Sequence, residues 1–488
     1  MILRIFGHDF HYECENLCRV YYPNEKINIV YDESGEDSKQ IITRCGPIDG
    51  GNRITVEAFI DGENRTLQSD VICGENELRD KSELKTAQLI FEALSDITGY
   101  TPPWGVLTGV RPSKLMLRLN ESMGEEAAYR YFTEDLLVSK EKADLAATVA
   151  AAEEKIVALS EKNSFSLYVS IPFCPTRCSY CSFVSHSISN PSARKLLPEY
   201  LEMLSQELEI TGKIASELGL KLESIYFGGG TPGVLEASQL DSLLCSVEKG
   251  FDLSALREYT VEIGRPDTVT PEKLRALKLH NVERISINPQ TFNQKTLDII
   301  GRKHSVEQAV KAYQLARAYD FKSINMDLIA GLPEETVEEF MASVDTAISL
   351  RPENITVHTL ALKRSSELNA SGAKVTGGNE AKAMLEYASS RLSRMYKPYY
   401  MYRQSKCVGN LENVGWCTEG NECLYNVFMM EECHTVLAAG AGGVTKLCEP
   451  GGTNVERIYN YKYPYEYISG FDKITERKNG IKSFYLSY

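Results

Sequence analysis

From residue 165 onward, short apolar runs alternate along the chain with longer amphipathic stretches. The apolar runs have the length of buried strands, and the stretches between them repeat apolar residues at i, i+3 and i+4, as helices packed on a sheet do. This rhythm predicts strands at residues 167–171, 224–227, 259–263, 284–287, 323–329 and 354–359. It predicts the main helices between them at residues 198–218, 238–249, 306–319 and 335–350.

Strands that alternate with helices in this way form a parallel sheet with right-handed crossover connections. Six strands are too few to close a full barrel of eight. We therefore expect an α/β fold with a partial (β/α)6 barrel that is open on one side and admits a large substrate. On such barrels the functional side chains gather at the carboxyl ends of the strands.

The pattern changes on both sides of this core. Residues 1–80 read as β-rich, with strand-like runs "KINIVY", "KQIITRC" and "RITVEAFI" between turn formers. Residues 81–163 read as helical, so the first two segments predict an α+β N-terminal domain that leads into the barrel at residues 164–376. Residues 377–488 begin with a helical pattern and continue as an aromatic-rich and glycine-rich C-terminal extension.

Charge and hydropathy argue against proteins that coat nucleic acid or membranes and against proteins that span a membrane. The chain has 67 acidic and 53 basic residues, a net charge of -14. This balance argues against a protein that coats nucleic acid or an anionic membrane, because both need a basic face. No apolar run reaches the roughly 18 residues that a membrane span needs, and the first residues lack a signal-peptide core. We expect a cytoplasmic protein with no membrane span and no nucleic-acid partner.

The thirteen cysteines include three that are unusually close together, in "YVSIPFCPTRCSYCSF". Cys174, Cys178 and Cys181 form a C-x3-C-x2-C array just after an apolar run. A structural zinc ion would need a fourth ligand, for which His186 is the near candidate. A [4Fe–4S] cluster can leave one iron to another molecule, so this spacing favours a cluster, with zinc or inert thiols as the alternatives.

Polar residues also follow several of the expected strands. The run "YFGGGTP" comes where the second strand ends, and glycines there allow a ligand to approach the backbone closely. Glu262 lies within an apolar strand, where an acid is usually paired or bound to a ligand. Gln290 and Asp327 stand at later strand ends. These residues are the expected site of the barrel.

Together, the three-cysteine loop, GGGTP, the strand glutamate and "DLIAGLP" resemble the radical S-adenosylmethionine (SAM) superfamily. The segment from residue 165 to about 360 is similar to the oxygen-independent coproporphyrinogen III oxidase family. The N-terminal module with "PPWGVLTGVRPSKL" looks like the long branch of that family, the coproporphyrinogen dehydrogenases of Gram-positive anaerobes.

The resemblance implies a role for individual residues. Cys174, Cys178 and Cys181 would hold three irons of a [4Fe–4S] cluster, and SAM would chelate the fourth. Tyr168 would pack beside the cluster and SAM, and Tyr168, Glu262 and Arg302 would serve the catalytic step. The positions implied to contact SAM are Tyr168, Gly229, Gly230, Thr231, Glu262, Gln290, Arg302, Asp327, Ala330 and Gly331.

The resemblance also implies a reaction. A 5'-deoxyadenosyl radical derived from SAM would drive the oxidative decarboxylation of two propionates of coproporphyrinogen III to vinyl groups. The product would be protoporphyrinogen IX, an intermediate of haem biosynthesis. A low-potential donor such as flavodoxin or ferredoxin would supply electrons, and the C-terminal extension would cover the substrate.

One residue of the cysteine stretch departs from part of the family. Some of these oxidases carry a fourth cysteine at the position of Phe183, whereas relatives that act as haem chaperones carry phenylalanine there. A haem-binding chaperone without decarboxylase activity is therefore an alternative. A radical SAM enzyme acting on another tetrapyrrole is a second alternative.

Two further groups of residues are candidates for binding. A tetracarboxylate substrate needs cations near the barrel mouth, and the candidates are Arg265, Lys303, Lys363, Arg364, Arg403 and Lys406. A second metal site could use the C-terminal cysteines, but they form no C-x2-C pair and read as structural thiols. These are Cys407, Cys417, Cys423, Cys433 and Cys448, with His434 nearby.

Overall fold

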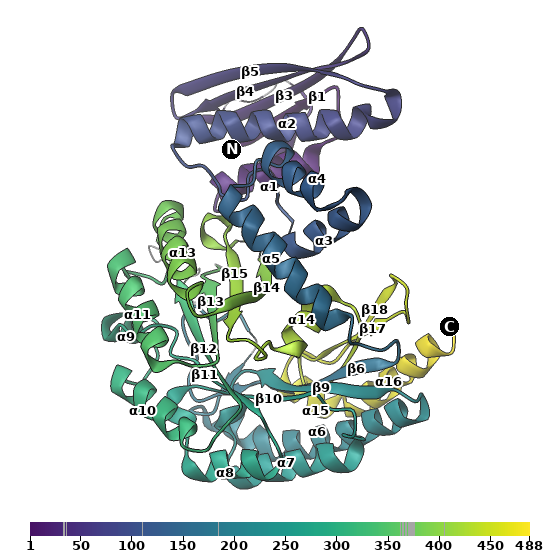
Figure 1. The fold of residues 1–488 in the computed structure, drawn as a ribbon, viewed down its shortest axis with the longest axis vertical. Helices are drawn as coiled ribbons and strands as arrows, with labels where there is room; N and C mark the ends of the chain where they lie inside the picture. The colour runs from purple at the N-terminus through teal and green to yellow at the C-terminus, as the bar shows by residue number, and fades with distance from the viewer. Residues whose placement is uncertain are drawn as a thin grey trace. The chain divides into compact units, whose positions relative to one another are not determined.

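The computed structural model describes the 488 residues apart from 33, 34, 36, 110, 184, 362, 364, 365, 367, 369–375 and 405 (Figure 1). Arg364, one of the candidate substrate cations, lies outside the described residues. The chain forms two compact units. One is made of Met1–Ala150, Gly377–Lys382 and Met401–Glu412, and the other of Ala151–Thr376, Ala383–Tyr400 and Asn413–Tyr488. The finer division at residues 80, 163 and 376 stays a prediction.

The first unit is an α+β domain built on a five-stranded sheet in the order β2-β1-β3-β4-β5. β1 runs parallel to β2 and β3, whereas β3, β4 and β5 form antiparallel pairs. The strands are β1 (Ile2–Phe6), β2 (Asn28–Val30), β3 (Lys39–Ile48), β4 (Gly51–Ile60) and β5 (Glu63–Ile72). The helices are α1 (His11–Tyr21), α2 (Glu75–Thr98), α3 (Pro112–Met123), α4 (Glu125–Arg130) and α5 (Lys140–Val157), and α4 continues into a π-helical turn, Tyr131–Asp135.

A buried polar cluster explains the "PPWG" segment of this unit. The carboxylate of Glu412 accepts a hydrogen bond from Trp104 Nε1 at 2.7 Å and also pairs with the ammonium of Lys142. Trp104, Lys142 and Glu412 are all buried. A buried carboxylate needs such partners because its desolvation is costly, so this cluster ties the segment to α5 within the unit.

The second unit contains most of an eleven-stranded sheet, in the order β14-β15-β13-β12-β11-β10-β9-β6-β16-β17-β18. Its six central strands are parallel and confirm the expected partial barrel. They are β6 (Ser164–Ile171), β9 (Lys221–Gly229), β10 (Glu258–Gly264), β11 (Arg284–Ile287), β12 (Ser323–Ala330) and β13 (Asn354–Thr359). Figure 1 shows helices covering the outer side of this curved sheet.

The helices of this unit begin where the sequence supplies caps. They are α6 (Pro191–Glu217), α7 (Ala237–Gly250), α8 (Pro271–Leu279), α9 (Gln294–Ile299), α10 (Val306–Arg317), α11 (Val337–Leu350) and α13 (Gly378–Leu392), the last of which begins in the first unit. α7, α10 and α11 each begin with a capping box, at Glu236, Ser305 and Thr336 respectively. The side chain of the cap residue accepts a hydrogen bond from the backbone N–H of the third helical residue, and the side chain of that third residue accepts one from the backbone N–H of the cap residue. These paired bonds satisfy two orphan N–H groups per helix and fix its start.

The central strands alternate between an apolar outer face and a polar inner face. On β10, Val261 and Ile263 are buried apolar residues, whereas Thr260 and Glu262 between them are polar. The same alternation occurs in Ile324 and Met326 of β12, which flank Asn325. Because successive side chains of a strand point to opposite faces, the helices cover the apolar side. The interior of the barrel is therefore polar.

The C-terminal residues extend the sheet at both ends. β15 (Glu412–Cys417) pairs antiparallel with β13, next to β14 (Lys397–Arg403), and β16 (Thr435–Ala439) lies parallel to β6. The remaining elements are α14 (Leu424–Glu431), β17 (Val444–Cys448), β18 (Val455–Tyr459), α15 (Pro464–Ser469) and α16 (Phe471–Tyr485). These five strands were not predicted, because their positions beside β6 and β13 depend on partners far away in sequence.

The elements that were predicted are confirmed with small changes in their ends. Residues 284–287 and 354–359 match β11 and β13, and the expected helix at 198–218 begins seven residues earlier, at Pro191. In the first unit, β1, α1 and β5 were missed. Among the helices of the described residues, none is both long and apolar enough to cross a bilayer.

Candidate active site

The three cysteines lie on the loop that follows β6. Cys174 ends the two-residue strand β7 (Phe173–Cys174), which pairs with β8 (His186–Ser187), and Cys181 N donates to Cys178 O at 3.1 Å. Ser179 N donates to Ile300 O at 3.1 Å, which anchors the middle of the loop. Burial raises the pKa of the Cys181 thiol to about 11. One loop therefore holds three thiols in a largely desolvated place.

The sulfurs of the three cysteines are not packed as closely as a single zinc ion would hold them. Among the residues that the structure describes, the donor atoms of Cys174, Cys178 and Cys181 are not all within 4.8 Å of one another, and His186 completes no such set. Zinc would require sulfurs much closer together, because each Zn–S bond is only about 2.3 Å. Several irons hold their thiolates further apart, as a [4Fe–4S] cluster does.

The glycine-rich loop after β9 packs directly against the cysteine loop. Gly230 N donates to Ile171 O and Thr231 N donates to Phe173 O, each at 2.8 Å. A Cβ atom on Gly230 would lie 2.6 Å from Phe173 O and 2.9 Å from Cys174 Sγ. Gly229 has φ 111°, a conformation open to glycine. This close approach is what the GGGTP run provides, and Thr231 Oγ1 also donates to Cys174 Sγ at 3.4 Å.

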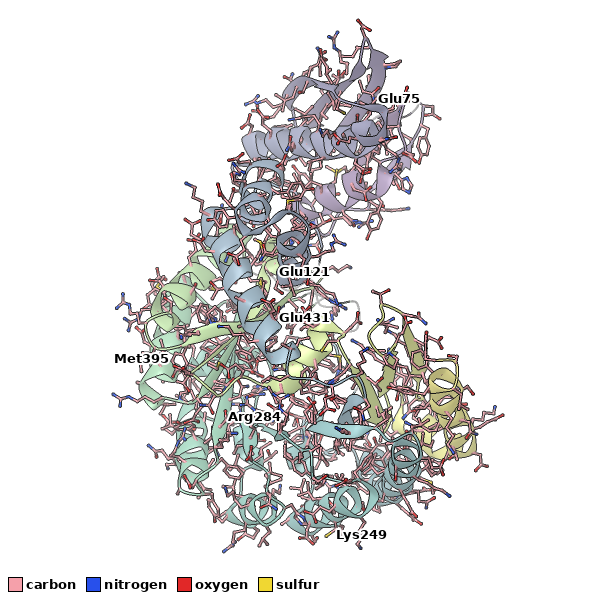
Figure 2. All side chains as sticks on the ribbon, turned by 45° about the vertical axis from the view of Figure 1, so that its right-hand side comes forward. Glu75, Glu121, Lys249, Arg284, Met395 and Glu431 are labelled. Carbon is pink, nitrogen blue, oxygen red and sulfur yellow. The ribbon has the colours of Figure 1, made fainter. Side chains whose placement is uncertain are left out.

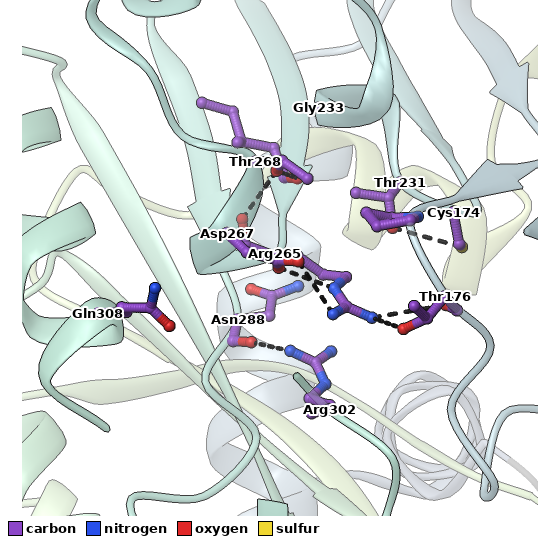
Figure 3. A network of polar contacts seen from close by, with 12 residues as sticks. Cys174, Thr176, Thr231, Gly233, Arg265, Asp267, Thr268, Asn288, Arg302 and Gln308 are labelled. Atoms are coloured by element: carbon purple, nitrogen blue, oxygen red, sulfur yellow. Dashed lines mark hydrogen bonds and ion pairs between the residues drawn. The ribbon is translucent and has the colours of Figure 1, made fainter. Parts of the chain in front are cut away.

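Arg265 joins the end of β10 to the cysteine loop (Figure 3). Its guanidinium bonds both oxygens of Asp267, at 2.9 and 3.1 Å, and donates to Thr176 Oγ1 at 2.7 Å. Thr176 lies between Cys174 and Cys178. Arg265 is 2% exposed, so its positive charge interacts with these partners within the site and not with solvent. The sequence did not reveal this link, because the partners are 89 residues apart.

Arg302 is a second buried cation beside the loop. It donates from Nη1 to Asn288 O at 2.5 Å and from Nη2 to Tyr180 Oη at 3.3 Å. Tyr180 lies between Cys178 and Cys181. Nε of Arg302 has no hydrogen-bond partner among the described residues, although it is buried. A buried guanidinium with a spare donor is suited to a carboxylate.

Two acids project from neighbouring parts of the polar interior. Glu262 accepts from Tyr226 Oη at 2.5 Å, and burial raises its pKa to about 7. Asp327 accepts from Asn325 Nδ2 at 2.7 Å and has His358 Nε2 at 3.7 Å. The raised pKa of Glu262 marks a carboxyl whose charge is poorly solvated, which is common at functional sites.

Backbone bonds join Gln290 to the end of β12. Gln290 has φ 70°, its N–H donates to Asp327 O at 2.9 Å, and its carbonyl accepts from Ile329 N at 2.9 Å. Ala330 ends the strand, and Gly331 has φ 87°. Gln290 is therefore held beside Asp327 by the backbone of β12, and Ala330 and Gly331 follow at the end of the same strand.

The side chain of Tyr168 belongs to a stack of three tyrosines. Its ring lies 5.9 Å from that of Tyr425 and 6.4 Å from that of Tyr226, and the Tyr226 and Tyr425 rings are 4.5 Å apart. Tyr425, at the start of α14, could not be predicted from the sequence, because only the tertiary fold brings α14 to β6 and β9. The stack supplies an apolar wall next to Glu262.

A small cavity lies beside Tyr226, in the interior of the barrel. Arg284, labelled in Figure 2, is buried there and donates to Asn421 O at 2.9 Å. A cavity of about 20 Å³ is lined by Tyr226, Thr260, Arg284 and Ser286, among others. That volume holds about one water molecule, so this cavity is too small for a cofactor of the size of SAM.

Two of the expected substrate cations, Arg265 and Arg403, are buried and hydrogen-bonded to other groups of the protein. Arg265 is paired as described, and Arg403 is 3% exposed and donates to Leu107 O at 2.6 Å and to Asn410 O at 3.0 Å. Both guanidiniums are therefore engaged by groups of the protein itself. Lys303, Lys363 and Lys406 stay candidates.

His434, the histidine near the C-terminal cysteines, has two serine hydroxyls as partners. His434 is buried between Ser160 and Ser166, whose hydroxyls lie 3.0 and 2.7 Å from its two ring nitrogens. Burial lowers the pKa of His434 to about 3, so the ring is neutral. Over the described residues, none of the C-terminal cysteines is part of a three-donor group, and their interpretation as structural thiols stays a prediction.

A partial barrel that carries a three-cysteine loop and a glycine-rich loop at its strand ends is the arrangement of a radical SAM protein. The model of the Radical SAM superfamily matches residues 168–347. The oxygen-independent coproporphyrinogen-III oxidase-like protein HemZ of Bacillus subtilis is 35% identical over 98% of this chain and 97% of its own length. The chain belongs to the radical SAM superfamily, in the family of oxygen-independent coproporphyrinogen-III oxidase-like proteins.

Two further similarities concern parts of the chain. The haem chaperone HemW of Bacillus subtilis is 37% identical over 40% of this chain and 50% of its own length. The solved structure of coproporphyrinogen III oxidase (HemN) from Escherichia coli shares the fold, with a TM-score of 0.53 and 21% identity over 67% of this chain and 73% of that one. As a member of the superfamily, the protein uses a [4Fe–4S] cluster and SAM.

Proposed function

We propose that the protein is an oxygen-independent coproporphyrinogen III dehydrogenase, which converts two propionates of its substrate into vinyl groups by oxidative decarboxylation. The observation that carries the substrate assignment is the similarity to the HemZ protein, which extends over 98% of this chain. The geometry of the site supports the class of chemistry, because the three thiols, the Gly230 contact and the buried Arg302 fit the cluster and SAM.

In this proposal Cys174, Cys178 and Cys181 hold the cluster, and Thr231 and the backbone of Gly229 and Gly230 border the SAM site. The remaining residues assigned to SAM are Glu262, Gln290, Arg302, Asp327, Ala330 and Gly331, with Tyr168 beside them. When bound, the two groups supply the one-electron chemistry that removes a hydrogen atom from a propionate side chain.

The chain's own residues orient these groups and exclude water. Arg302 has a donor that can pair with a carboxylate of SAM. Tyr226 donates to Glu262, which favours the charged carboxylate, whereas burial favours the neutral acid, so this group accepts or releases a proton near neutral pH. The Tyr168, Tyr226 and Tyr425 rings keep that side of the site dry. Lys303 and Lys363 are candidates for the substrate carboxylates.

The test is an anaerobic assay with reconstituted cluster, SAM, a low-potential reductant and coproporphyrinogen III. We expect 5'-deoxyadenosine and a vinyl porphyrinogen, and Cys178→Ser is expected to lose both products together with its iron. Formation of neither product by the iron-loaded parent protein would contradict the proposal.

A haem chaperone is the second candidate, and two observations support it. Phe183, at the position where some of the oxidases carry a cysteine, is 67% exposed and lies two residues after Cys181. The chaperone HemW is also 37% identical over 196 residues. Stable haem binding by the iron-loaded protein without turnover of coproporphyrinogen III would support this candidate over the first.

A further inference from the structure

A cluster of metal-binding side chains lies on the outer helices of the barrel, apart from the cysteine loop. Asp241 and Cys245 are four residues apart on α7, so both face the same way. His280 follows the last residue of α8. One donor atom from each of these three residues lies within 4.8 Å of the other two.

The orientation of His280 is fixed by a fourth residue. Nδ1 of His280 lies 2.9 Å from Glu248 Oε1, and Nε2 lies 3.1 Å from Asp241 Oδ1. When Nδ1 carries the proton and donates to Glu248, the lone pair of Nε2 points to the side of Asp241. A carboxylate that holds the far nitrogen of a histidine is the usual support of a metal-bound imidazole.

The donor set selects a class of metal. A thiolate, an imidazole and a carboxylate are the three ligand types that Zn²⁺ accepts together, whereas Mg²⁺ and Ca²⁺ prefer oxygen alone. Cys245 is a free thiol. The Asp241 side chain is 51% exposed, so water can reach the site and complete a tetrahedron.

The position of the cluster separates it from the radical chemistry. His280 comes shortly before Arg284, the first residue of β11, and therefore lies toward the amino ends of the strands. The cysteine loop and GGGTP follow the carboxyl ends of β6 and β9. Figure 1 shows α7 and α8 side by side on the outer layer, and Figure 2 labels Lys249, which follows Glu248. A metal here would join two helices, and the amino-terminal side of such barrels serves stability.

We propose that Asp241, Cys245 and His280 bind one Zn²⁺ ion, with Glu248 as the positioning residue for His280. The ion bridges α7 and α8 and stabilises the barrel. This inference is independent of the reaction proposed above.

The test uses the full-length protein with its iron–sulfur cluster in place, kept anaerobic and dialysed against buffered Zn²⁺. Zinc content and the zinc X-ray absorption edge are measured, because that edge is separate from the edge of iron. We expect about one zinc per chain, with one sulfur at about 2.3 Å and nitrogen or oxygen ligands at about 2.0–2.1 Å. Zinc is also expected to raise the melting temperature of the parent protein.

Two substitutions and one control decide the assignment. Cys245→Ser and His280→Gln are expected to lose the bound zinc and the zinc-dependent rise in melting temperature, while keeping the iron content of the parent. Cys45→Ser, which removes another half-buried free thiol, is expected to keep both. No retained zinc in the parent, zinc bound to two or more sulfurs, or an unchanged zinc content in both variants would overturn the proposal.

Discussion

Gly230 shows how one small residue sets the geometry of the site. Its Cα lies so close to the cysteine loop that no side chain fits between them, since a Cβ atom would meet Phe173 O at 2.6 Å. Backbone atoms cannot move aside as the end of a flexible side chain can. The glycine at this position therefore serves close packing rather than a tight turn alone.

For Gly230→Ala we expect the cysteine loop to be pushed away from the loop after β9, which weakens cluster binding. Changes that displace metal ligands typically cost about 10–100-fold in affinity. Iron content after anaerobic gel filtration measures the effect. Gly74→Ala is the matched control, because Gly74 has φ -62° and a Cβ there would meet nothing within 4 Å. Equal iron content in the two variants would contradict this account.

The buried Glu335 is expected to make the stability of the protein depend on pH. Burial raises the pKa of the Glu335 carboxyl to about 7, above the ordinary value of 4.5, although Thr291 donates a hydrogen bond to it. Between pH 4.5 and 7 the folded state then binds the proton that the unfolded state has lost, so the free energy of unfolding falls as pH rises through this window. Glu335→Gln is expected to remove this fall, a difference of up to about 3 kcal/mol.

Melting temperatures of Glu335→Gln and of the parent at pH 5 and pH 8 measure this difference. The exposed Glu338 on the first turn of α11 provides the control Glu338→Gln, which should follow the parent at both values. The same dependence on pH in Glu335→Gln and in the parent would show that Glu335 titrates normally.

At the scale of elements, the period of the hydrophobic pattern predicted the core well. The alternation around Thr260 and Glu262 and the apolar stripes of the helices are local properties, so they can be read without the fold. The additions to the sheet could not be read in this way. β16 pairs with β6 from about 270 positions away, with Thr435 opposite Phe165, and nothing in either segment alone specifies that partner.

The contact between β10 and the cysteine loop gives a prediction for Arg265. Replacing it by glutamine removes the two-pronged bond to Asp267 and the bond to Thr176, so the loop should hold its cluster less firmly. We expect faster loss of iron to a chelator. Lysine should restore this only partly, because it cannot bond Asp267 in the same two-pronged way.

Arg275→Gln is the matched control for Arg265, because Arg275 is exposed on α8 and pairs with Glu272 on the same helix. It should release iron at the rate of the parent. Arg265→Gln that releases iron no faster than Arg275→Gln would show that the pairing with Asp267 and Thr176 does not position the loop.

Two ion pairs between α6 and α16 offer a direct comparison of buried and exposed charge. Lys478 pairs with Glu207 at 2.8 Å with both side chains 1% exposed, whereas Lys482 and Glu217 are 38% and 43% exposed. Lys478→Met leaves Glu207 buried without its cation and should cost about 3 kcal/mol or more. Lys482→Met should cost less than about 1 kcal/mol.

Denaturant unfolding of the two lysine variants gives these costs. Both substitutions replace a lysine of α16 by methionine, so the change in helix propensity and in side-chain length is the same in the two variants. A cost for Lys478→Met as small as that for Lys482→Met would contradict the role of Glu207, which also accepts from Tyr467 Oη and Gly440 N.

At the scale of the whole molecule, the sequence predicted which residues stand at the strand ends but not how they are held. Cys174, Gly230 and Thr231 are in contact, as a site of this kind requires. The hydrogen bonds of Arg265 and Arg403 and the packing of Tyr425 against Tyr226 were not predicted. Each of these contacts depends on a partner that only the tertiary fold brings close. Spacing identifies ligands on one loop, whereas pairing across elements requires the fold.

The central claim is that this site removes a hydrogen atom from the propionate side chains of coproporphyrinogen III. The most direct measurement uses substrate deuterated at the propionate β-carbons, with the iron-loaded protein, SAM and a low-potential reductant under anaerobic conditions. We predict that deuterium appears in 5'-deoxyadenosine while vinyl groups form. Vinyl formation with unlabelled 5'-deoxyadenosine, or 5'-deoxyadenosine without any vinyl product, would contradict the account.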